Sequence, residues 1–213
     1  MDLLECIKTR RSIRKFLEVP VEWDKVGTIV DAGRCAPNSG NLQNWKFIII
    51  LDAGTRRKLA EACLQQLWMA RAPVHIIICS EPEKAKRFYG IRGERFYTIQ
   101  NCAAAIQNML LTAHSLRLGA CWVGAFDEDM VKSAAGIPDY ARPQAVIPVG
   151  YPAEKVPTPM QYQLENVVFI ERWGNRIKSM NEYLGYTSEV VQDLIERGKK
   201  VLKKISKKIK KEK

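Results

Sequence analysis

Four cations and one hydroxyl lie within six residues near the start of the chain, in the sequence R-R-S-I-R-K at 10–15. Arginine guanidinium groups are planar, forked donors that match phosphate oxygens, and the Ser12 hydroxyl adds a neutral donor. The cluster therefore predicts a site for a small phosphorylated ligand. A solvated basic turn that complements the end of a helix is the alternative interpretation.

A second group of polar side chains lies in the loop A-P-N-S-G-N-L-Q-N-W at 36–45, which runs into an apolar segment at 47–51. Side-chain amides and hydroxyls can both donate and accept, so they suit recognition of the edge of a heterocycle. A loop at the edge of a rigid strand is also a common binding position. An ordinary turn between a helix and a strand is the alternative.

Small residues at Gly124 and Ala125 follow the apolar stretch that starts at Ala120, and Asp127 then caps a short helix that ends at Gly136. Such small residues let a ligand touch the main chain, and the helix start adds N–H donors. A close-packed strand end would also explain them.

Other chemistry is disfavoured by what surrounds the histidines and cysteines. His75 lies inside an apolar segment and His114 late on a helix, so both are interpreted as structural. No Ser/His/Asp or Cys/His arrangement is apparent, which disfavours a nucleophilic hydrolase. The six cysteines form no C-x-x-C pair, so the sequence predicts no metal site, and the cysteines are expected to be small buried residues of a reduced compartment.

The net charge of +11 is concentrated at one end of the chain: 198–213 holds nine lysines and one glutamate, a net +8, which leaves +3 for the rest. Val201, Leu202, Ile205 and Ile209 would share one stripe of a basic helix. This tail could be a frayed terminus, a helix docked on the protein or on a dimer partner, or a surface for an anionic membrane or nucleic acid. No specific nucleic-acid binding is expected.

The 213 residues can build one sizeable core. Apolar periodicity predicts helices alternating with apolar strands, and so a central sheet covered on both faces. The start shows no signal sequence and the apolar runs are short for a membrane span, so a cytoplasmic protein is expected. The expected helices are 2–9, 21–35, 55–70, 96–118 closed by Gly119, and 128–135; the expected strands are 47–51, 74–79, 120–126, 145–149 and 167–170, with a loop at 81–95.

Four motifs in register give the sequence a resemblance to the FMN-dependent nitroreductase family over residues 1–176. They are R-R-S-I-R at 10–14; the loop at 36–45, similar to A-P-S-x-x-N-x-Q-P-W; Ala72-Pro73 before a strand; and L-G-A-C-W-V-G-A-F at 118–126. The resemblance implies an α+β fold, with a mixed central sheet flanked by helices on both faces, in an intertwined homodimer. Residues 177–213 would be a lysine-rich helical extension.

The resemblance also implies roles for single residues. Arg10 and Ser12, with Arg11 nearby, would hold the FMN phosphate, and Arg14 would lie toward N1 and O2 of the flavin, where a cation stabilises the reduced form. Gly124 and Ala125 would present N–H groups to flavin N5 and O4. Four residues would reach the flavin from the other subunit: Pro37, Asn38, Ser39 and Asn41.

Further implied contacts are less defined. Gln65 or Gln66 would meet the pyrimidine edge, and 167–170 would add to the sheet of the partner subunit. The sequence departs from the family pattern where Gln161 replaces a usual basic phosphate contact. Two alternatives follow: Arg172 or Arg176 compensates, or the first cluster holds the phosphate alone. Asn38 replaces a Ser that is common in the family, and Asn44 replaces a common Pro.

The implied function is an NAD(P)H-dependent oxidoreductase that reduces FMN by hydride transfer and then reduces a nitroaromatic, a quinone or a similar conjugated acceptor. Because the cofactor carries this chemistry, no protein acid, base or metal signature is required. Two alternatives stay open. One is a dehalogenase or flavin-destroying enzyme of the same fold family, and the other is a basic-tailed binding protein on a flavin-fold scaffold.

Overall fold

The computed structural model describes residues 1–176 and 193–200, which belong to two compact units, Met1–Thr158 and Pro159–Lys213. The first unit holds the sheet, the core and every predicted motif up to residue 126. The lysine-rich stripe predicted from Val201 onward lies outside the described residues. The predicted domain boundary at 176 stays a prediction.

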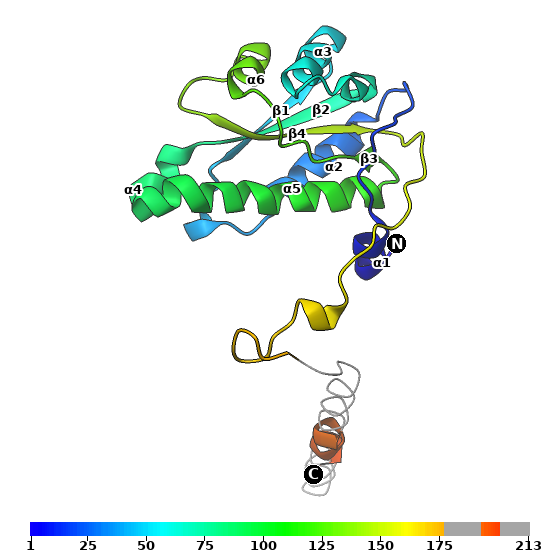
Figure 1. The fold of residues 1–213 in the computed structure, drawn as a ribbon, viewed down its shortest axis with the longest axis vertical. Helices are drawn as coiled ribbons and strands as arrows, with labels where there is room; N and C mark the ends of the chain where they lie inside the picture. The colour runs from blue at the N-terminus through cyan, green and yellow to red at the C-terminus, as the bar shows by residue number, and fades with distance from the viewer. Residues whose placement is uncertain (177–192, 201–213) are drawn as a thin grey trace, which may run out of the picture. The chain divides into compact units, whose positions relative to one another are not determined.

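The first unit is built on a four-stranded sheet with the order β1-β2-β4-β3 (Figure 1). These strands are β1 (Trp45–Ile50), β2 (Val74–Ser80), β3 (Gly119–Ala120) and β4 (Arg142–Gly150), and all three pairings are antiparallel. The parallel component expected of a mixed sheet is one bridge, between Ser12 and Ala120.

Helices cover both faces of this sheet, as the burial of every residue of β2 requires, because successive side chains of a strand point to opposite faces. α2 (Trp23–Arg34) and α5 (Thr98–Ser115) lie on one face, and α3 (Ala53–Ala62) and α6 (Glu128–Ala135) lie on the other (Figure 1). Ile76 and Ile78 pack toward α2 and α5, whereas Ile77 packs in the cluster with α3 and α6. The predicted α+β arrangement with two covered faces is confirmed.

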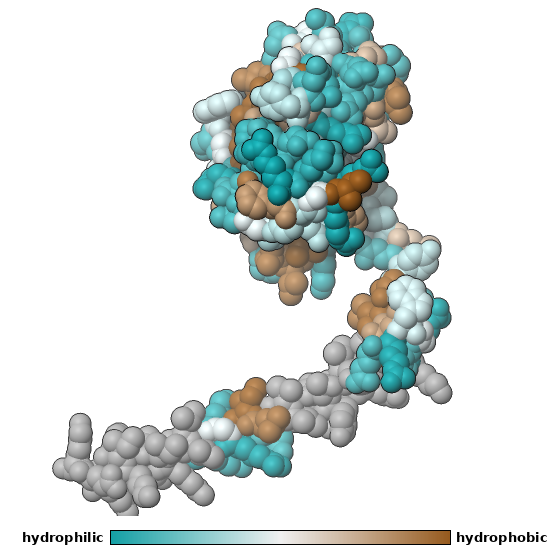
Figure 2. All heavy atoms as spheres, turned by 90° about the vertical axis from the view of Figure 1, so that its left-hand side faces the viewer, coloured by the Kyte–Doolittle hydropathy of each residue, from teal (hydrophilic) through white to brown (hydrophobic). Residues whose placement is uncertain are grey.

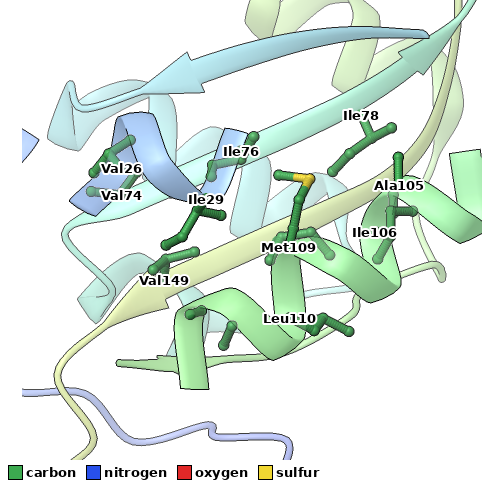
Figure 3. Close-up of a cluster of buried hydrophobic side chains, with 14 of the residues drawn as sticks. Val26, Ile29, Val74, Ile76, Ile78, Ala105, Ile106, Met109, Leu110 and Val149 are labelled. Carbon is green, nitrogen blue, oxygen red and sulfur yellow. The ribbon is translucent and has the colours of Figure 1, made fainter. Parts of the chain in front are cut away.

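The larger core lies between the sheet and the α2–α5 pair (Figure 3). Ile29 of α2 and Ile106 and Met109 of α5 belong to one cluster with Ile76 of β2, and all four side chains are fully buried. Burying one such side chain stabilises the fold by about 2 kcal/mol. This cluster fixes α5 firmly along the sheet.

Local caps begin and end several helices where the sequence predicts them. Asp2 accepts a hydrogen bond from Glu5 N at 3.0 Å at the start of α1 (Leu3–Thr9). Asp127 accepts from Met130 N at 2.9 Å at the start of α6, and Gly136 ends that helix in the left-handed conformation. The predicted apolar side of α1 is different: Leu4 is 64% exposed, and only Cys6 of this helix is buried.

The helix predicted at 55–70 is wrong in its second half. α3 ends at Ala62 because Leu64 and Gln65 both adopt left-handed backbone conformations, and a short 3-10 helix follows at Leu67–Arg71. Leu67, which lies within the predicted helix, is 52% exposed. No glycine or proline marks this reversal in the sequence, so periodicity alone extends the helix too far.

The loop predicted at 81–95 is also wrong. It contains α4 (Pro82–Arg92), with Pro82 in its first turn, and a π-helical turn at Gly93–Tyr97. α4 lies at the left of Figure 1 and faces the viewer in Figure 2, where apolar surface lies among polar surface. Only Ala85 of α4 is buried, so this helix needs no apolar stripe. Its sequence of mixed charges therefore shows no helical periodicity.

The end of α5 differs from the prediction as well. The helix stops at Ser115, and Arg117, not Gly119, takes the left-handed conformation after it. Gly119 instead begins β3, which has only two residues, and Val123 forms a separate bridge to Val146. The predicted strand 120–126 is therefore reduced to two short contacts with β4.

The second unit contains a 3-10 turn at Leu164–Asn166 and a bridge between Phe169 and Arg176. Among the described residues, the segment 167–170, which was predicted as a strand, forms only this isolated bridge. Residues 193–200 are helical, with an ion pair between Asp193 and Arg197. Across the described residues, the structure has no helix long and apolar enough to span a bilayer.

The histidines and cysteines mostly occupy the structural positions that the sequence predicts. His75 is fully buried in β2, and its Nε2 lies 2.9 Å from Met69 O. Burial lowers the pKa of His75 to about 4, so the neutral ring is the folded form. Five cysteines are buried as predicted, whereas Cys35 is exposed at the end of α2.

The buried His75 should make stability depend on pH. The unfolded chain binds a proton near pH 6.5 and the folded chain only near pH 4, so stability is full above pH 6.5 and falls as the pH drops. We expect a loss of about 3 kcal/mol in the free energy of unfolding from this residue by pH 4. Urea unfolding of wild type and His75→Gln across this range checks it; identical pH slopes would contradict the assignment.

Candidate functional site

The basic cluster is an extended segment held on two sides. Ser12 forms a parallel bridge with Ala120, and Ile13 N donates to Ala120 O at 3.1 Å. On the other side, Ala153 N donates to Lys15 O at 2.8 Å. The cluster therefore lies between β3 and the connector 151–158 that follows β4.

Alternation along this extended segment separates its side chains into two sets. Arg10, Ser12 and Arg14 surround the thiol of Cys121: burial raises the pKa of that thiol, while the Arg14 cation, the Ser12 hydroxyl and the Arg10 cation oppose the rise. The structure thus brings together Arg10 and Ser12, predicted at the phosphate, and Arg14, predicted toward N1 and O2 of the flavin. In the described part of the chain, the Arg10 and Arg14 guanidinium groups form no ion pair.

Arg11 has a different environment. Its guanidinium donates to Lys8 O at 2.8 Å, Arg10 O at 2.7 Å and Pro157 O at 3.3 Å, and also to the Thr158 hydroxyl. Four of its five N–H groups are therefore used within the chain. Arg11 fastens the end of α1 to the connector.

Glu154 joins the same two segments in the opposite direction. Its Oε1 accepts from Arg14 N at 2.6 Å and from Lys15 N at 3.0 Å. A carboxylate that accepts two main-chain N–H bonds fixes the segment that carries the arginines. The sequence analysis missed this residue, because nothing in the sequence of a proline-rich connector marks which carboxylate contacts the basic segment.

His114 lies at the Arg11 side of the cluster. Its Nε2 is 2.9 Å from Thr9 Oγ1, and its pKa is lowered by burial and then by the Arg10 and Arg11 cations. A cavity of about 480 Å³ opens beside it, lined by Arg11, Ile13 and the connector at 152–156. His114 is therefore a contact between α1 and α5, which agrees with the structural interpretation.

The segment 121–127 crosses the sheet between two anchors. Val123 exchanges hydrogen bonds with Val146 at 2.9 and 3.1 Å, and Asp127 N donates to Ala62 O at 2.9 Å. Gly124 and Ala125 lie between these anchors, exposed, and their N–H groups have no acceptor among the residues that the structure describes. If Gly124 carried a Cβ atom, its nearest neighbours would be side-chain atoms of Trp122, at 3.6 Å or more. These two donors are open to a ligand.

The loop at 36–44 is fixed by its own side chains. Asn38 Oδ1 accepts from Gln43 N at 2.8 Å, and Asn41 Oδ1 accepts from Gln43 Nε2 at 3.2 Å. Ser39 N donates to Asn101 Oδ1 at 2.9 Å, which ties the loop to the start of α5. Pro37 is exposed and Ser39 half-buried, so both present surface to the outside.

Asn101 is a second residue that the sequence analysis missed. It lies on the buried face of α5 with Cys102, Ala105 and Ile106. A signal was present in the sequence, because an amide within an apolar helical stripe must find a polar partner when it is buried. The possible glutamine contacts remain less defined: Gln65 is exposed, and Gln66 Nε2 donates to Cys63 O at 2.9 Å.

Within one chain, the loop and the basic cluster lie at opposite ends of α5 (Figure 1). The loop contacts Asn101 near the start of α5, whereas the end of α1 contacts His114 near its other end. Thirteen helical residues separate these two contacts, which corresponds to about 20 Å. The structure thus brings Ser12 beside Ala120 and Cys121 but leaves the loop distant from them.

Comparison with known proteins agrees with the motifs. The family model described as "Nitroreductase family" matches residues 7–69 and 64–151, which is more than half of the chain. The chain belongs to the nitroreductase family. A family protein from Methanothermobacter thermautotrophicus, whose name provisionally gives NADH dehydrogenase/NAD(P)H nitroreductase, is 37% identical over 179 residues, covering 81% of this chain and 88% of the relative.

Two further members extend the comparison. A Bacillus subtilis protein named FMN reductase [NAD(P)H] is 22% identical over 210 residues, covering 92% of this nitroreductase-family chain and 84% of the relative. The crystal structure of a nitroreductase family protein from Clostridium novyi has a TM-score of 0.67 at 27% identity, covering 83% of this chain and 97% of that one. The α+β nitroreductase fold is thereby confirmed.

The clamp formed by Arg11 generates a prediction. Arg11→Ala removes four hydrogen bonds and should free the connector, so that trypsin cleaves after Lys155 roughly tenfold faster. Mass spectrometry of timed digests measures this rate. Lys15→Ala, which removes a neighbouring exposed cation, is the control. Equal cleavage of the two variants would show that Arg11 does not hold the connector.

Proposed function

We propose that this nitroreductase-family chain is an NAD(P)H-dependent FMN oxidoreductase that works as a homodimer with FMN at the subunit interface. When bound, FMN supplies hydride chemistry, taking a hydride from NADH or NADPH and passing it to an acceptor that binds afterwards. Membership of the family and the FMN reductase and NAD(P)H nitroreductase names of its relatives support this reading. The protein supplies binding, orientation and charge.

The free donors of the cluster fit a phosphate. Arg10 and Ser12 lie on one side of the extended segment, with Arg14 beside them, and these arginine side chains carry no carboxylate partner in the part of the chain that the structure describes. Two cations and a hydroxyl are the donors that a phosphate requires. Arg10 and Ser12 would hold the phosphate, and Arg14 would place its charge near N1 and O2. Arg11 would support them by holding the segment.

Gly124 and Ala125 fit the reacting edge of a flavin. Their main-chain N–H groups are exposed and lack acceptors within the described residues, and no bulky side chain of their own covers them. They would donate to N5 and O4 and orient the ring, leaving one face open to donor and acceptor in turn.

The position of the loop 37–41 carries the dimer proposal. This loop lies about 20 Å along α5 from the basic cluster, so one chain cannot direct both toward the same ring. A second chain would complete the site by contributing Pro37, Asn38, Ser39 and Asn41. The exposed apolar side chains of α1, including Leu3, Leu4 and Ile7, give the partner an apolar surface to cover. Residues 167–170 would add to the partner's sheet.

The acceptor would be a small conjugated molecule, such as a nitroaromatic or a quinone, because a hydride leaving the flavin needs an electron-poor, planar partner. A cytoplasmic location and the absence of specific nucleic-acid binding remain predictions from the sequence. The same is true of a contact between the lysine-rich tail and a membrane surface.

Arg10 offers a direct test of the phosphate assignment. Arg10→Ala should raise the dissociation constant for FMN roughly 30-fold, because a hydrogen bond to a charged group contributes about 2 kcal/mol. Quenching of FMN fluorescence measures this constant. Arg57→Ala, which removes an exposed arginine from α3, should leave it unchanged. Equal affinity of Arg10→Ala and wild type would remove Arg10 from the phosphate site.

Leu4 tests the dimer. Leu4→Glu places a charge on the exposed apolar side of α1 and should raise the dimer dissociation constant at least roughly tenfold, with loss of FMN from the monomer. Analytical ultracentrifugation with absorbance detection measures both the dimer dissociation constant and the amount of bound FMN. Leu51→Glu, at an exposed position after β1, is the matched control. A Leu4→Glu protein that stays dimeric and keeps FMN would contradict the arrangement.

A further inference from the structure

A chain of side-chain hydrogen bonds runs through the interior from Asn101 of α5. Asn101 and Asn44 are buried, with 4% and 0% exposure. Asn101 Nδ2 donates to Asn44 Oδ1 at 2.8 Å, and Asn44 Nδ2 donates to Thr98 Oγ1 at 3.0 Å. The Thr98 hydroxyl donates in turn to Gly93 O at 2.9 Å. The chain thus joins the loop 38–44 to the start of α5 and the π-helical turn.

The same amide of Asn101 also holds Ser39. Asn101 Oδ1 accepts from Ser39 N at 2.9 Å, and Asn101 Nδ2 donates its second hydrogen to Ser39 Oγ at 2.9 Å. Both N–H groups of this amide are therefore used, which fixes which end is oxygen and which is nitrogen. Ser39 Oγ accepts from Asn101 and donates to no acceptor among the described residues, so its own hydrogen is available to a ligand.

The loop that these bonds hold has an unfavourable backbone. Gly40, Asn41 and Gln43 have φ values of 54°, 55° and 47°, in the left-handed region. For a residue with a side chain this conformation costs about 1 kcal/mol, so the loop needs contacts that outweigh the strain. At Gly40 a Cβ atom would collide with the Tyr89 hydroxyl, so α4 also packs against the loop.

We propose that Asn101, acting through Ser39 and Asn44, is a positioning residue that sets the flavin-binding conformation of the loop and makes the Ser39 hydroxyl a donor. The free Ser39 hydrogen then suits a ligand acceptor, such as a flavin carbonyl or a ribityl oxygen. This inference rests on the proposed function, in which the loop 37–41 reaches the FMN of the partner subunit. It adds a residue that touches no flavin but controls the polarity of one that does.

The same helix provides a matched control. Asn108 lies two turns further along α5, and its Nδ2 donates to Ala32 O of α2 at 3.1 Å. It is an amide that joins α5 to a neighbouring element, as Asn101 does, but its partner lies outside the loop. Substitution of Asn108 reports the general effect of removing one such amide from the helix.

The test compares full-length Asn101→Leu and Asn108→Leu proteins by FMN titration and by visible circular dichroism at saturating FMN. Asn101→Leu should raise the FMN dissociation constant at least roughly tenfold over Asn108→Leu, since two bonds to Ser39 and one to Asn44 are lost. The circular dichroism of the bound flavin should also change, because the loop then meets the ring differently. A purely structural asparagine would lower thermal stability but leave that spectrum as in wild type.

Thr98→Val supplies a second variant in case Asn101→Leu does not fold. It keeps the shape of Thr98 and removes only the hydroxyl that accepts from Asn44, so a smaller rise in the FMN dissociation constant, roughly threefold, is expected. An unchanged constant and flavin spectrum in the folded Asn101→Leu protein, or in Thr98→Val if that protein alone folds, would overturn the positioning role. Failure of wild type to bind FMN would overturn the proposed function and this inference together.

Discussion

The burial of β2 on both faces is the constraint on which the rest of the structure depends. All seven residues of this strand are buried, including His75, so helices must cover the sheet above and below. The α2–α5 pair and the α3–α6 pair satisfy this need with separate apolar clusters. As a result, the segments between strands and helices emerge at the sheet edges, where main-chain donors can stay free for a ligand.

The length of α5 then determines how the site is divided. Its buried face runs the length of the sheet, and its two ends hold different parts of the proposed site. Asn101 contacts the loop 36–44, and His114 contacts Thr9 at the end of α1, next to the basic cluster. Since a helix is rigid over this distance, no small adjustment within one chain can bring the two parts together. The proposed homodimer would resolve the separation, because a second copy of the chain would supply the missing part, and the exposed apolar side of α1 would give that copy a surface to cover.

Much of the fold follows from the sequence. Continuous apolar segments predicted β2 and β4, and caps at Asp2, Asp127 and Gly136 predicted where helices begin or end. The failures have physical causes. α4 buries little of its surface and so lacks an apolar period, while α3 ends just before Leu64 and Gln65, which take left-handed conformations that no glycine or proline marks in the sequence.

The candidate site, like the fold, was predicted from the sequence only in part. Residue type and spacing indicated Arg10, Ser12 and Arg14, because four cations and a hydroxyl within six residues stand out in a sequence. They could not separate Arg11, whose donors turn toward the connector, from its neighbours. Glu154 acts through a contact between distant segments that no local pattern marks, whereas Asn101 was marked only as an amide within an apolar helical stripe, without its partners.

The central claim is that the chain carries FMN and reduces it with a nicotinamide nucleotide. The most direct test is the visible absorbance of the purified protein, with FMN added if needed, before and after anaerobic addition of NADH and then NADPH. The account predicts flavin bands that travel with the protein and are bleached by at least one nucleotide. A protein that takes up no FMN, or a bound flavin that neither nucleotide bleaches, would contradict it.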